Sequence, residues 1–330
     1  MVDEATGRPL PNAQVALETA DGLGVPRLTD AQGRARVVVG GAAGRVRVRQ
    51  IGYRPASPSI GAEPGRAELV VRLTRVPLVL ARHRVAGQSS CLAFADSAER
   101  EAAAALYTRL REAAEQYDAF RRAYPFEARV EHRITSPRAD SGRVPRVRVS
   151  AERYWSDRWA GDYQPGDVLR WDAGSFRANL LFVTTLTDPR FWRSHCFAAG
   201  GTTTVGGRTA IQVTFAPTPE TRGPDWSGAA LLDTATSQLL RVDFRLERGG
   251  RSAPKRLEGY TTFMTPSPFV AVPESTYAVW WERGPGDDGA WGLPDAAQVR
   301  LVRHLVYRRP PPPPVLAPSP GPPSTVLPTP

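Results

Sequence analysis

The strongest constraint in this sequence is a polar–apolar alternation of period two at both ends of the chain, interrupted by one segment with the period of a helix. Alternation of this kind places apolar side chains on one face of a strand, whereas apolar residues three and four apart share one face of a helix. The alternation occurs within residues 14–73 and again within residues 126–306. The chain is therefore predicted to be mainly β, with two strand-rich bodies separated by one helix.

The predicted strands of the first body are short and are separated by turn residues. Four such strands with glycine- and proline-rich turns favour an antiparallel sandwich over parallel strands joined by helices. One turn is predicted at residues 30–33, where Asp30 can bond backbone amides and Gly33 can take a positive φ. The four strands are predicted at residues 14–18, 34–39, 45–51 and 68–73.

The helix is predicted over residues 96–124 and is followed by a large antiparallel sheet. Asp96 and Glu99 form a capping box at its start, and Pro125 ends it. Its apolar face must pack against the sheet. That face consists of Leu106, Leu110, Ala113, Tyr117, Phe120 and Tyr124. The strands of the sheet are predicted at residues 126–134, 146–155, 168–171, 210–215, 228–232, 239–246, 257–263, 275–282 and 297–306, with hairpin turns at glycine pairs 206–207 and 249–250.

At 330 residues the chain exceeds the usual size of one domain. We expect a sandwich over residues 1–76, a connector over 77–95 with a strand at 79–85, a helix-and-sheet domain over 96–309 and a disordered tail over 310–330. The tail is rich in proline, which can neither pair within a sheet nor continue a helix. It is expected to be a solvated spacer or, alternatively, a ligand for a proline-binding partner.

Composition excludes several classes of protein. Hydrophobic residues make up 41% and charged residues 23% of the chain, and no apolar run reaches the length of a membrane-spanning helix. The net charge of +10 comes from arginines that alternate with apolar residues, as in residues 45–49 and 146–149. We interpret these segments as strands with one solvated face, so nucleic acid is not expected as a partner. Binding to an anionic surface or polymer is the alternative.

The first body carries turn and strand residues that resemble one known family. They are similar to the signature of the carboxypeptidase regulatory-like, or transthyretin-like, domain, a non-catalytic module of exported proteins. The resemblance implies a prealbumin-like antiparallel β-sandwich in which these residues shape the scaffold. The residues are Asp3, Thr6, Gly7, Pro9, Leu10, Pro11, Asn12, Ala13, Val15, Leu17, Thr29, Asp30, Gly33, Ile51, Gly52, Tyr53 and residues 69–73.

The same resemblance implies a location outside the cytoplasm. The family's domain opens with a strand before the Asp3 turn, and only Met1 and Val2 remain of it here. A sheet that begins within a strand leaves a neighbour's backbone groups unpaired. We expect that the true start lies upstream, with a first strand and a signal peptide, and that the protein is periplasmic or associated with the outer membrane.

The helix-and-sheet domain carries a second likeness, over residues 228–242. This predicted strand–turn–strand unit resembles outer-membrane lipoprotein-sorting proteins and related curved-sheet proteins. In that fold one long helix lies in the concave face of a large antiparallel sheet. The resemblance therefore implies an α+β domain of the same design.

The chain has two cysteines, Cys91 and Cys196. In an exported protein they are expected to form a disulfide, which stabilises a loop of this length by roughly 4–5 kcal/mol in the chain-entropy treatment. Two buried thiols are the first alternative, and a reactive Cys196 beside His195 is the second. Neighbours in a strand point to opposite faces, which argues against the reactive pair.

No residue pattern predicts a catalytic, metal or cofactor site. His83, His132, His195 and His304 lack the spacing of metal ligands, and each is expected to be structural or exposed. A nucleophile elbow, a phosphate-binding glycine loop and a dinucleotide fingerprint are also missing from the sequence. We therefore expect no catalytic residue, no metal and no cofactor.

Aromatic residues are the best candidates for ligand contact. Tryptophan and tyrosine on a sheet can stack on sugars or line an apolar pocket, and they can also fill the space between sheet and helix. Core filling is expected for most of them. Trp155, Trp159 and Trp171 are the candidates for a ligand-facing cluster.

Two functional hypotheses follow. The first is a non-enzymatic binding or interaction protein of the cell envelope, monomeric, whose curved sheet holds an apolar or peptide ligand or whose partner is another protein. The helix face from Leu106 to Tyr124 then either fills the concave face or moves aside. The second is an accessory or hydrolase-like enzyme domain with a site between the two bodies. It requires His132, His195 and carboxylates to converge on one cavity.

Overall fold

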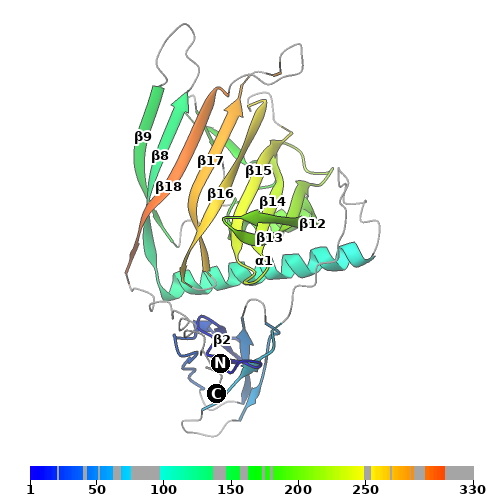
Figure 1. Cartoon of the computed structure of the whole chain (residues 1–330), viewed down its shortest axis with the longest axis vertical. Coiled ribbons are helices and arrows are strands. Elements are labelled where there is room, and N and C mark those ends of the chain that lie inside the picture. Colours follow the sequence, from blue (N-terminus) through cyan, green and yellow to red (C-terminus); the bar gives the residue numbers. More distant parts are fainter. Residues whose placement is uncertain are drawn as a thin grey trace, which may run out of the picture.

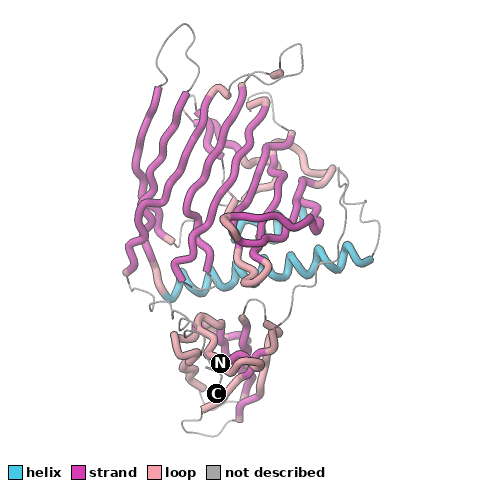
Figure 2. Tube along the Cα trace, viewed as in Figure 1, coloured by secondary structure: helices cyan, strands magenta, loops and turns pink. Residues whose placement is uncertain are grey.

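The fold is mainly β, as predicted, with one long helix that crosses the larger sheet near its end (Figure 1). Figure 2 shows strands on both sides of this helix, in a large sheet and in a smaller N-terminal body. The computed structural model describes residues 1–20, 22–39, 43–50, 53–61, 68–75, 97–136, 146–156, 163–172, 175–178, 181–248, 254–267, 270–282, 284–285 and 294–308.

The large sheet has nine strands, and every neighbouring pair is antiparallel. Eight of the nine strand predictions in this domain fall on its strands, and the ninth falls on β10. In spatial order the strands are β12 (His195–Val205), β13 (Arg208–Pro217), β14 (Asp225–Asp233), β15 (Leu239–Glu247), β16 (Arg256–Ser267), β17 (Val270–Trp281), β18 (Ala296–Tyr307), β8 (Phe126–Ser136) and β9 (Arg146–Trp155).

Glycines at turns and in the middle of strands shape this sheet. Gly206 and Gly207 both have positive φ and join β12 to β13 in a two-residue hairpin, as the glycine pair predicts. Within the strands, Gly228 pairs with Phe215, and a Cβ at position 228 would lie 1.9 Å from the carbonyl oxygen of Asp243. Only glycine fits there, and its missing side chain leaves room for the phenylalanine ring.

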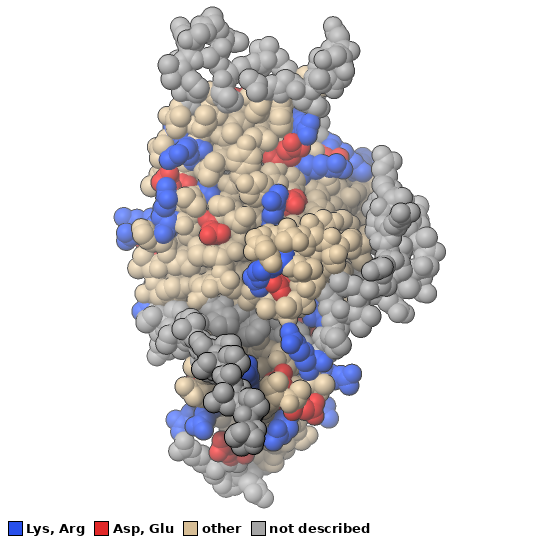
Figure 3. All heavy atoms as spheres, in the orientation of Figure 1, with Lys and Arg blue, Asp and Glu red and all other residues tan. Residues whose placement is uncertain are grey.

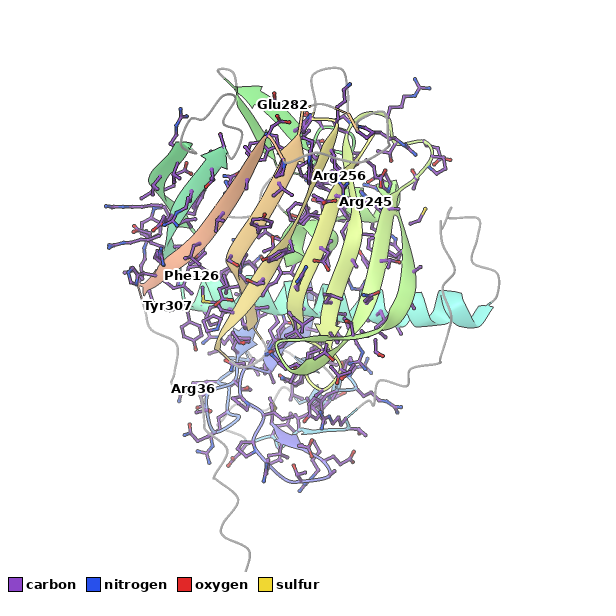
Figure 4. All side chains as sticks on the ribbon, turned by 45° about the horizontal axis from the view of Figure 1, so that its top comes forward. Arg36, Phe126, Arg245, Arg256, Glu282 and Tyr307 are labelled. Carbon is purple, nitrogen blue, oxygen red and sulfur yellow. The ribbon has the colours of Figure 1, made fainter. Side chains whose placement is uncertain are left out.

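The helix α1 (Ser97–Ala123) ends two residues before Pro125, which cannot continue it. The predicted apolar face is buried in the main core, with Leu110 and Phe120 fully covered. At its C-terminal end Phe120 meets Phe126 and Tyr307 with ring centroids 6.5 and 6.2 Å away. Phe126 and Tyr307 lie together in Figure 4, where β8 begins and β18 ends. The helix therefore covers one face of the sheet.

Between residues 163 and 194 only β10 was predicted, and the other short elements of this region were not. These include α3 (Pro189–Ser194), which begins with Asp188 as its N-cap and Pro189 in its first turn. The Asp188 carboxylate accepts a hydrogen bond of 2.7 Å from the Arg190 backbone amide. The other elements of this region are α2 (Val183–Leu186) and the antiparallel pair β10 (Leu169–Asp172) and β11 (Ser175–Ala178).

The N-terminal body has its own small core and two sheets. The main sheet is antiparallel, and β1 pairs with β7 in parallel through two residues each. The core consists of Leu10, Val15, Val46, Val48, Val71 and Leu73. The strands are β1 (Val2–Asp3), β2 (Gln14–Thr19), β3 (Gly22–Leu23), β4 (Arg27–Leu28), β5 (Gly44–Arg49), β6 (Ser59–Ile60) and β7 (Arg72–Leu73).

Two strand predictions in this body were wrong. Residues 34–39 are not a strand, although Ala35 and Val37 do pack against the small core. The predicted strand at 68–73 shrinks to Arg72–Leu73. The alternation correctly indicated which side chains face inward, but a strand also needs a neighbouring backbone to pair with, which the alternation does not supply.

The turn residues behave largely as predicted. Gly7 and Gly33 have positive φ, and the Asp30 side chain accepts hydrogen bonds from the backbone amides of Gln32 and Arg34. Asp3 accepts hydrogen bonds from Thr6 and from the Tyr53 hydroxyl, 2.8 Å away. These bonds hold the pKa of Asp3 below its usual value, with the Tyr53 bond the largest cause. Asn12 differs: it takes a positive φ itself, and its side-chain oxygen has no partner among the described residues.

The helix also carries the contacts between the two bodies. The Gln116 side-chain amide donates a hydrogen bond of 2.7 Å to the Asn12 carbonyl oxygen, and Arg49 forms an ion pair with Glu115. Leu28 of β4 packs against the main core. One face of α1 therefore meets the sheet while its other side meets the N-terminal body.

Some predictions fall outside the described residues. They include the strand at 79–85, Asp96 of the capping box, the glycine pair 249–250 and the tail over 310–330. The domain boundaries near residues 76, 95 and 309 lie in or beside these segments and stay predictions.

Candidate functional site

The large sheet has an inward face, which α1 covers in part, and an outer face. Along β8 the residues Phe126, Ala128, Val130 and His132 are buried on the inward face, while their neighbours point outward. The register of the ladders assigns the other strands to the same two faces, because side chains at paired positions share a face. Along the outer face charged residues of both signs alternate, including Arg245 and Arg256 (Figures 3 and 4).

Nine apolar side chains on the inward face of β12 to β15 are almost entirely buried. We call this set the sealed face. It packs against α1, α2 and α3. It consists of Phe197, Ile211, Val213, Phe215, Trp226, Ala230, Leu232, Val242 and Phe244.

At the other side of the sheet, some inward side chains are half-buried or exposed, although others there, such as Val130, His132 and Ala278, are buried. We call the half-buried or exposed set the open face. It mixes apolar and polar groups on neighbouring strands, whereas the sealed face is wholly apolar. It consists of Ile134, Arg148, Ser150, Glu152, Trp280, Gln298, Arg300 and Val302.

A polar row crosses the open face from strand to strand. Arg300 Nε donates a hydrogen bond of 3.2 Å to His132 Nδ1, and His132 Nε2 lies 3.5 Å from a Glu152 carboxylate oxygen. On the next two strands the hydroxyls of Thr276 and Thr261 are 3.0 Å apart. His132, Arg300, Thr276 and Thr261 hold paired positions on β8, β18, β17 and β16, and Glu152 on β9 is the diagonal neighbour of His132, so the row follows from the register.

The His132 ring is neutral in this row. Its Nδ1 accepts from Arg300 and therefore carries no proton, which leaves Nε2 to point its N–H toward Glu152. Burial lowers the pKa of His132, the Arg300 guanidinium lowers this pKa further, and the Glu152 carboxylate opposes both. The row thus presents one guanidinium, one carboxylate and a neutral imidazole.

A second histidine–carboxylate pair lies deep in the sealed part of the domain. The Asp225 carboxylate accepts hydrogen bonds from the Tyr163 hydroxyl at 2.7 Å and from the Trp226 backbone amide at 2.8 Å. His195 Nε2 lies 3.6 Å from Asp225, and both side chains are 0% exposed. Ser194 is 3.1 Å from His195 Nδ1. By composition this set matches a nucleophile, a base and an acid.

The contacts of this cluster are structural. His195 Nε2 bonds to the Trp226 carbonyl oxygen at 2.8 Å, and its ring stacks on Phe191 with centroids 3.8 Å apart. The Ser194 hydroxyl donates to the carbonyl oxygen of Arg190 at 2.9 Å. Burial lowers the pKa of His195, and Asp225 opposes this shift. With every member enclosed and bonded, the cluster ties α3 to β12 and β14 and gives no substrate access.

The three tryptophans expected to face a ligand do not form a described cluster. Trp155 lies on the outer face, because it neighbours the inward Tyr154 on β9, and the Arg308 guanidinium lies 4.4 Å from its ring centroid. Trp171 is in β10, but only its backbone is described, and Trp159 lies outside the described residues. Trp280 and Trp226 are the tryptophans that the structure places on the inward face.

The disulfide expected between Cys91 and Cys196 stays a prediction. Cys196 lies at the start of β12 and is buried, whereas Cys91 lies outside the described residues. His195 and Cys196 are adjacent in the strand, and the His195 ring is engaged with Phe191 and Trp226. This geometry does not pair the imidazole with the sulfur as base and nucleophile.

A small cleft lies where α1 meets the N-terminal body, the region in which the enzyme hypothesis places its site. It has room for about one water molecule. Burial raises the pKa of Glu112 there, and Arg109 and Arg49 oppose the shift. The cleft is lined by Gln14, Arg49, Gln50, Glu112, Glu115 and Gln116, so neither His132 nor His195 reaches it.

In the described part of the chain, no group of three or more His, Cys, Asp or Glu side chains is arranged to hold a metal ion. No helix in the same residues combines the length and the apolar composition needed to cross a bilayer.

Sequence reasoning missed most of the open face. The alternation within their strands could have placed Ile134 and Val302 there, because it puts each of them on the same face as buried residues of its strand. Glu152 and Arg300 carried no such signal, because their meeting with His132 depends on the order of β9, β8 and β18 in the sheet. That order is not encoded locally.

Comparison with solved structures gives two to which this chain is similar in part. A DUF1329 family protein from Desulfovibrio piger is 11% identical, with a TM-score of 0.34, over 62% of this chain and 93% of its own. An outer membrane lipoprotein-sorting protein domain from Vibrio parahaemolyticus is 12% identical, with a TM-score of 0.33, over 60% and 93%. No family model matches the sequence, and no curated protein matches it. At these TM-scores the likeness carries no argument about function.

Proposed function

We propose that this chain is a non-enzymatic binding protein of the cell envelope that holds an apolar chain or an extended peptide against the open face of its large sheet. The observation that carries the proposal is the contrast between the two sides of one inward face. The sealed face is filled by α1, α2 and α3, whereas the open face keeps apolar side chains half-exposed. Apolar side chains grouped on an inward-facing, partly covered surface favour an apolar ligand.

The composition of the open face defines what such a ligand needs. Ile134 supplies an apolar contact, and Val302 and Trp280, which also pack against the main core, add the part of their surface that stays exposed. The polar row lies among them, with Arg300 able to meet a carboxylate or phosphate group and Glu152 able to meet an amide or ammonium group. An apolar chain with one polar end satisfies both parts of this surface. So does a peptide with alternating side chains.

The test uses neighbouring residues of β8 that point to opposite faces. Ile134 lies on the open face and Thr135 on the outer face, and both are half-buried. We expect Ile134→Arg to lower the affinity of the full chain for the apolar fluorophore N-phenyl-1-naphthylamine at least tenfold. Thr135→Arg is expected to change it less than twofold. Equal effects of the two substitutions, or no saturable binding by the wild-type chain, would contradict the proposal.

The enzyme alternative keeps a separate test. Its site between the two bodies would have to use Glu112, Glu115 and Arg49, which line a cleft with room for about one water molecule. We expect Glu112→Gln to leave binding at the open face unchanged. A hydrolytic activity that disappears in this variant would favour the enzyme instead.

The cell-envelope location rests on the regulatory-like residues of the N-terminal body and is tested by fractionation. In the native host the protein is expected in the periplasmic or outer-membrane fraction. Recovery in the cytoplasmic fraction, with both cysteines free to react with an alkylating reagent, would count against this location.

A further inference from the structure

The two edges of the nine-stranded sheet are built differently. At one edge, β12 has a register shift between Ala199 and Thr202, with Gly200 and Gly201 in between. At the other edge, β9 pairs with β8 through ten consecutive positions, from Glu127 with Trp155 to Ser136 with Arg146, and shows no shift. Bulges and irregularities protect an edge from further pairing, and β9 has none.

The outer edge of β9 has unpaired backbone groups. In an antiparallel ladder, alternate residues direct their N–H and C=O groups to opposite sides of the strand. Among the described residues, β9 has a neighbouring strand on one side only, and it forms the margin of the sheet in Figures 1 and 4. About half of its ten residues therefore offer hydrogen-bonding groups to an additional strand.

Apolar side chains accompany this edge. Val147 and Val149 project from the outer face of β9 and are 56% and 55% exposed. β9 carries no proline. A strand that paired with β9 could cover these valines with its own apolar residues.

The charges next to the valines are unbalanced. On the outer face of β8, the Glu127 carboxylate is shared by Arg129 at 3.3 Å and Arg153 at 3.9 Å. The Glu131 carboxylate is likewise shared by two guanidinium groups, those of Arg133 and Arg303. Each carboxylate thus serves two cations, which leaves a surplus of positive charge beside the edge.

We propose that the edge of β9 binds an extended acidic segment of a partner protein as an additional strand, whose outward side chains are apolar over Val147 and Val149 and acidic beside Arg153. The surplus of arginines selects for acidic residues on the added strand. The same charges oppose pairing with a second copy of β9, which carries them too. This surface is distinct from the open face, because it involves the strand edge and the outer face.

The experiment uses a fluorescein-labelled ten-residue peptide with the full chain, followed by fluorescence anisotropy. In the peptide Glu-Thr-Glu-Thr-Glu-Thr-Val-Thr-Val-Thr, called the Glu–Val peptide, the Glu and Val side chains share one face of the strand, as the arginines and valines do on the outer face of β8 and β9. We expect saturable binding by the wild-type protein and a loss of at least tenfold in affinity for the double variant Arg133→Glu, Arg153→Glu. The matched control is Arg241→Glu, Arg245→Glu. It reverses two outer-face arginines of β15 that each pair with one carboxylate of their own strand, and it is expected to change affinity less than twofold.

A second peptide separates strand pairing from charge attraction and needs no variant protein. The same sequence with every backbone nitrogen methylated keeps its charge but cannot donate hydrogen bonds along the edge, so we expect it not to bind. Three results would overturn the proposal. They are equal binding of the methylated peptide, an equal loss of affinity in the control variant, and no binding of the unmodified peptide by the wild-type chain. Equal affinity for double-stranded DNA of the same charge would also overturn it.

Discussion

Two strands of this protein have the same alternation of arginine and valine, in β5 and in β9, but different surroundings. In β5 the valines Val46 and Val48 belong to the small core and are 6% and 0% exposed. In β9 the corresponding valines are more than half exposed, because β9 is an edge strand whose outer face is uncovered. A local pattern fixes which side chains share a face, whereas the rest of the fold decides whether that face is buried.

The two histidine–carboxylate pairs repeat this contrast. His195 and Asp225 are enclosed and fully bonded, whereas His132 faces a Glu152 side chain that is 48% exposed. Similar residues therefore stabilise the core in one place and line a candidate ligand surface in the other. Four predictions, in order of decreasing effect, test whether residues that are enclosed in one place and exposed in the other contribute differently to stability and binding.

The largest effect is expected from Asp225→Ala. The substitution removes the acceptor of hydrogen bonds from the buried Tyr163 and Trp226 and from the half-buried Gly166. Leaving these donors unpaired should lower the free energy of unfolding by about 3–5 kcal/mol. Urea denaturation followed by circular dichroism measures it. Glu152→Ala on the open face is the control, and it is expected to lower the free energy of unfolding by less than about 1 kcal/mol. Similar losses of stability in both variants would contradict the difference between the enclosed and the exposed histidine–carboxylate pair.

Val48→Ala is expected to come next. Val48 is fully buried in the small core, and removing its methyl groups loses their burial and leaves a cavity. The expected loss is about 2 kcal/mol in the stability of the N-terminal body. Hydrogen exchange of the β5 backbone amides measures this loss of stability directly. Unchanged protection of these amides would show that the small core does not depend on β5.

A smaller effect is expected in the pH dependence of stability. The pKa of His132 in the folded protein is lowered, first by burial and then by Arg300. The unfolded chain therefore takes up this proton first, so the stability that neutral His132 contributes is present above about pH 6.5 and is lost as the pH falls below it. His132→Gln should reduce the loss of stability between about pH 7.5 and pH 5 by roughly 1 kcal/mol or less. The lowered pKa of His195 leaves part of the dependence in place. A variant that is as acid-sensitive as the wild type would show that the pKa of His132 does not differ between the folded and unfolded states.

The smallest effect is expected from Val149→Ala. Its side chain is more than half exposed, so the free energy of unfolding should change by less than about 0.5 kcal/mol. The same substitution is expected to weaken binding of the Glu–Val peptide, because it removes an apolar contact on the added strand. A large loss of stability would mean that Val149 is covered in the folded protein.

Much of the large sheet could be predicted from the sequence, since each of its strands except β12 has a clear alternation. The helix was equally clear, because Leu106 to Phe120 recur at helical spacing and Pro125 marks its end. The run from Asp188 to Phe197 was harder, because the chain changes from α3 to β12 at His195 without a glycine or proline between them. The N-cap and proline at its start could have identified α3.

The candidate sites depend on long-range order and could not be predicted. The polar row unites Glu152, His132 and Arg300 because β8 lies between β9 and β18, although β18 follows β8 by more than a hundred residues in sequence. The exposed valines of β9 depend on the same order, since only its place at the edge leaves them uncovered. Trp155 was expected to face a ligand, but its position in β9 turns it to the outer face.

The most direct test of the account is native mass spectrometry of the full chain isolated from its source without denaturation. The account predicts a monomer with an additional mass from an apolar chain or a peptide, present in the wild type and in Thr135→Arg and missing in Ile134→Arg. A bound mass that persists in Ile134→Arg, or a wild-type protein that carries none, would contradict it.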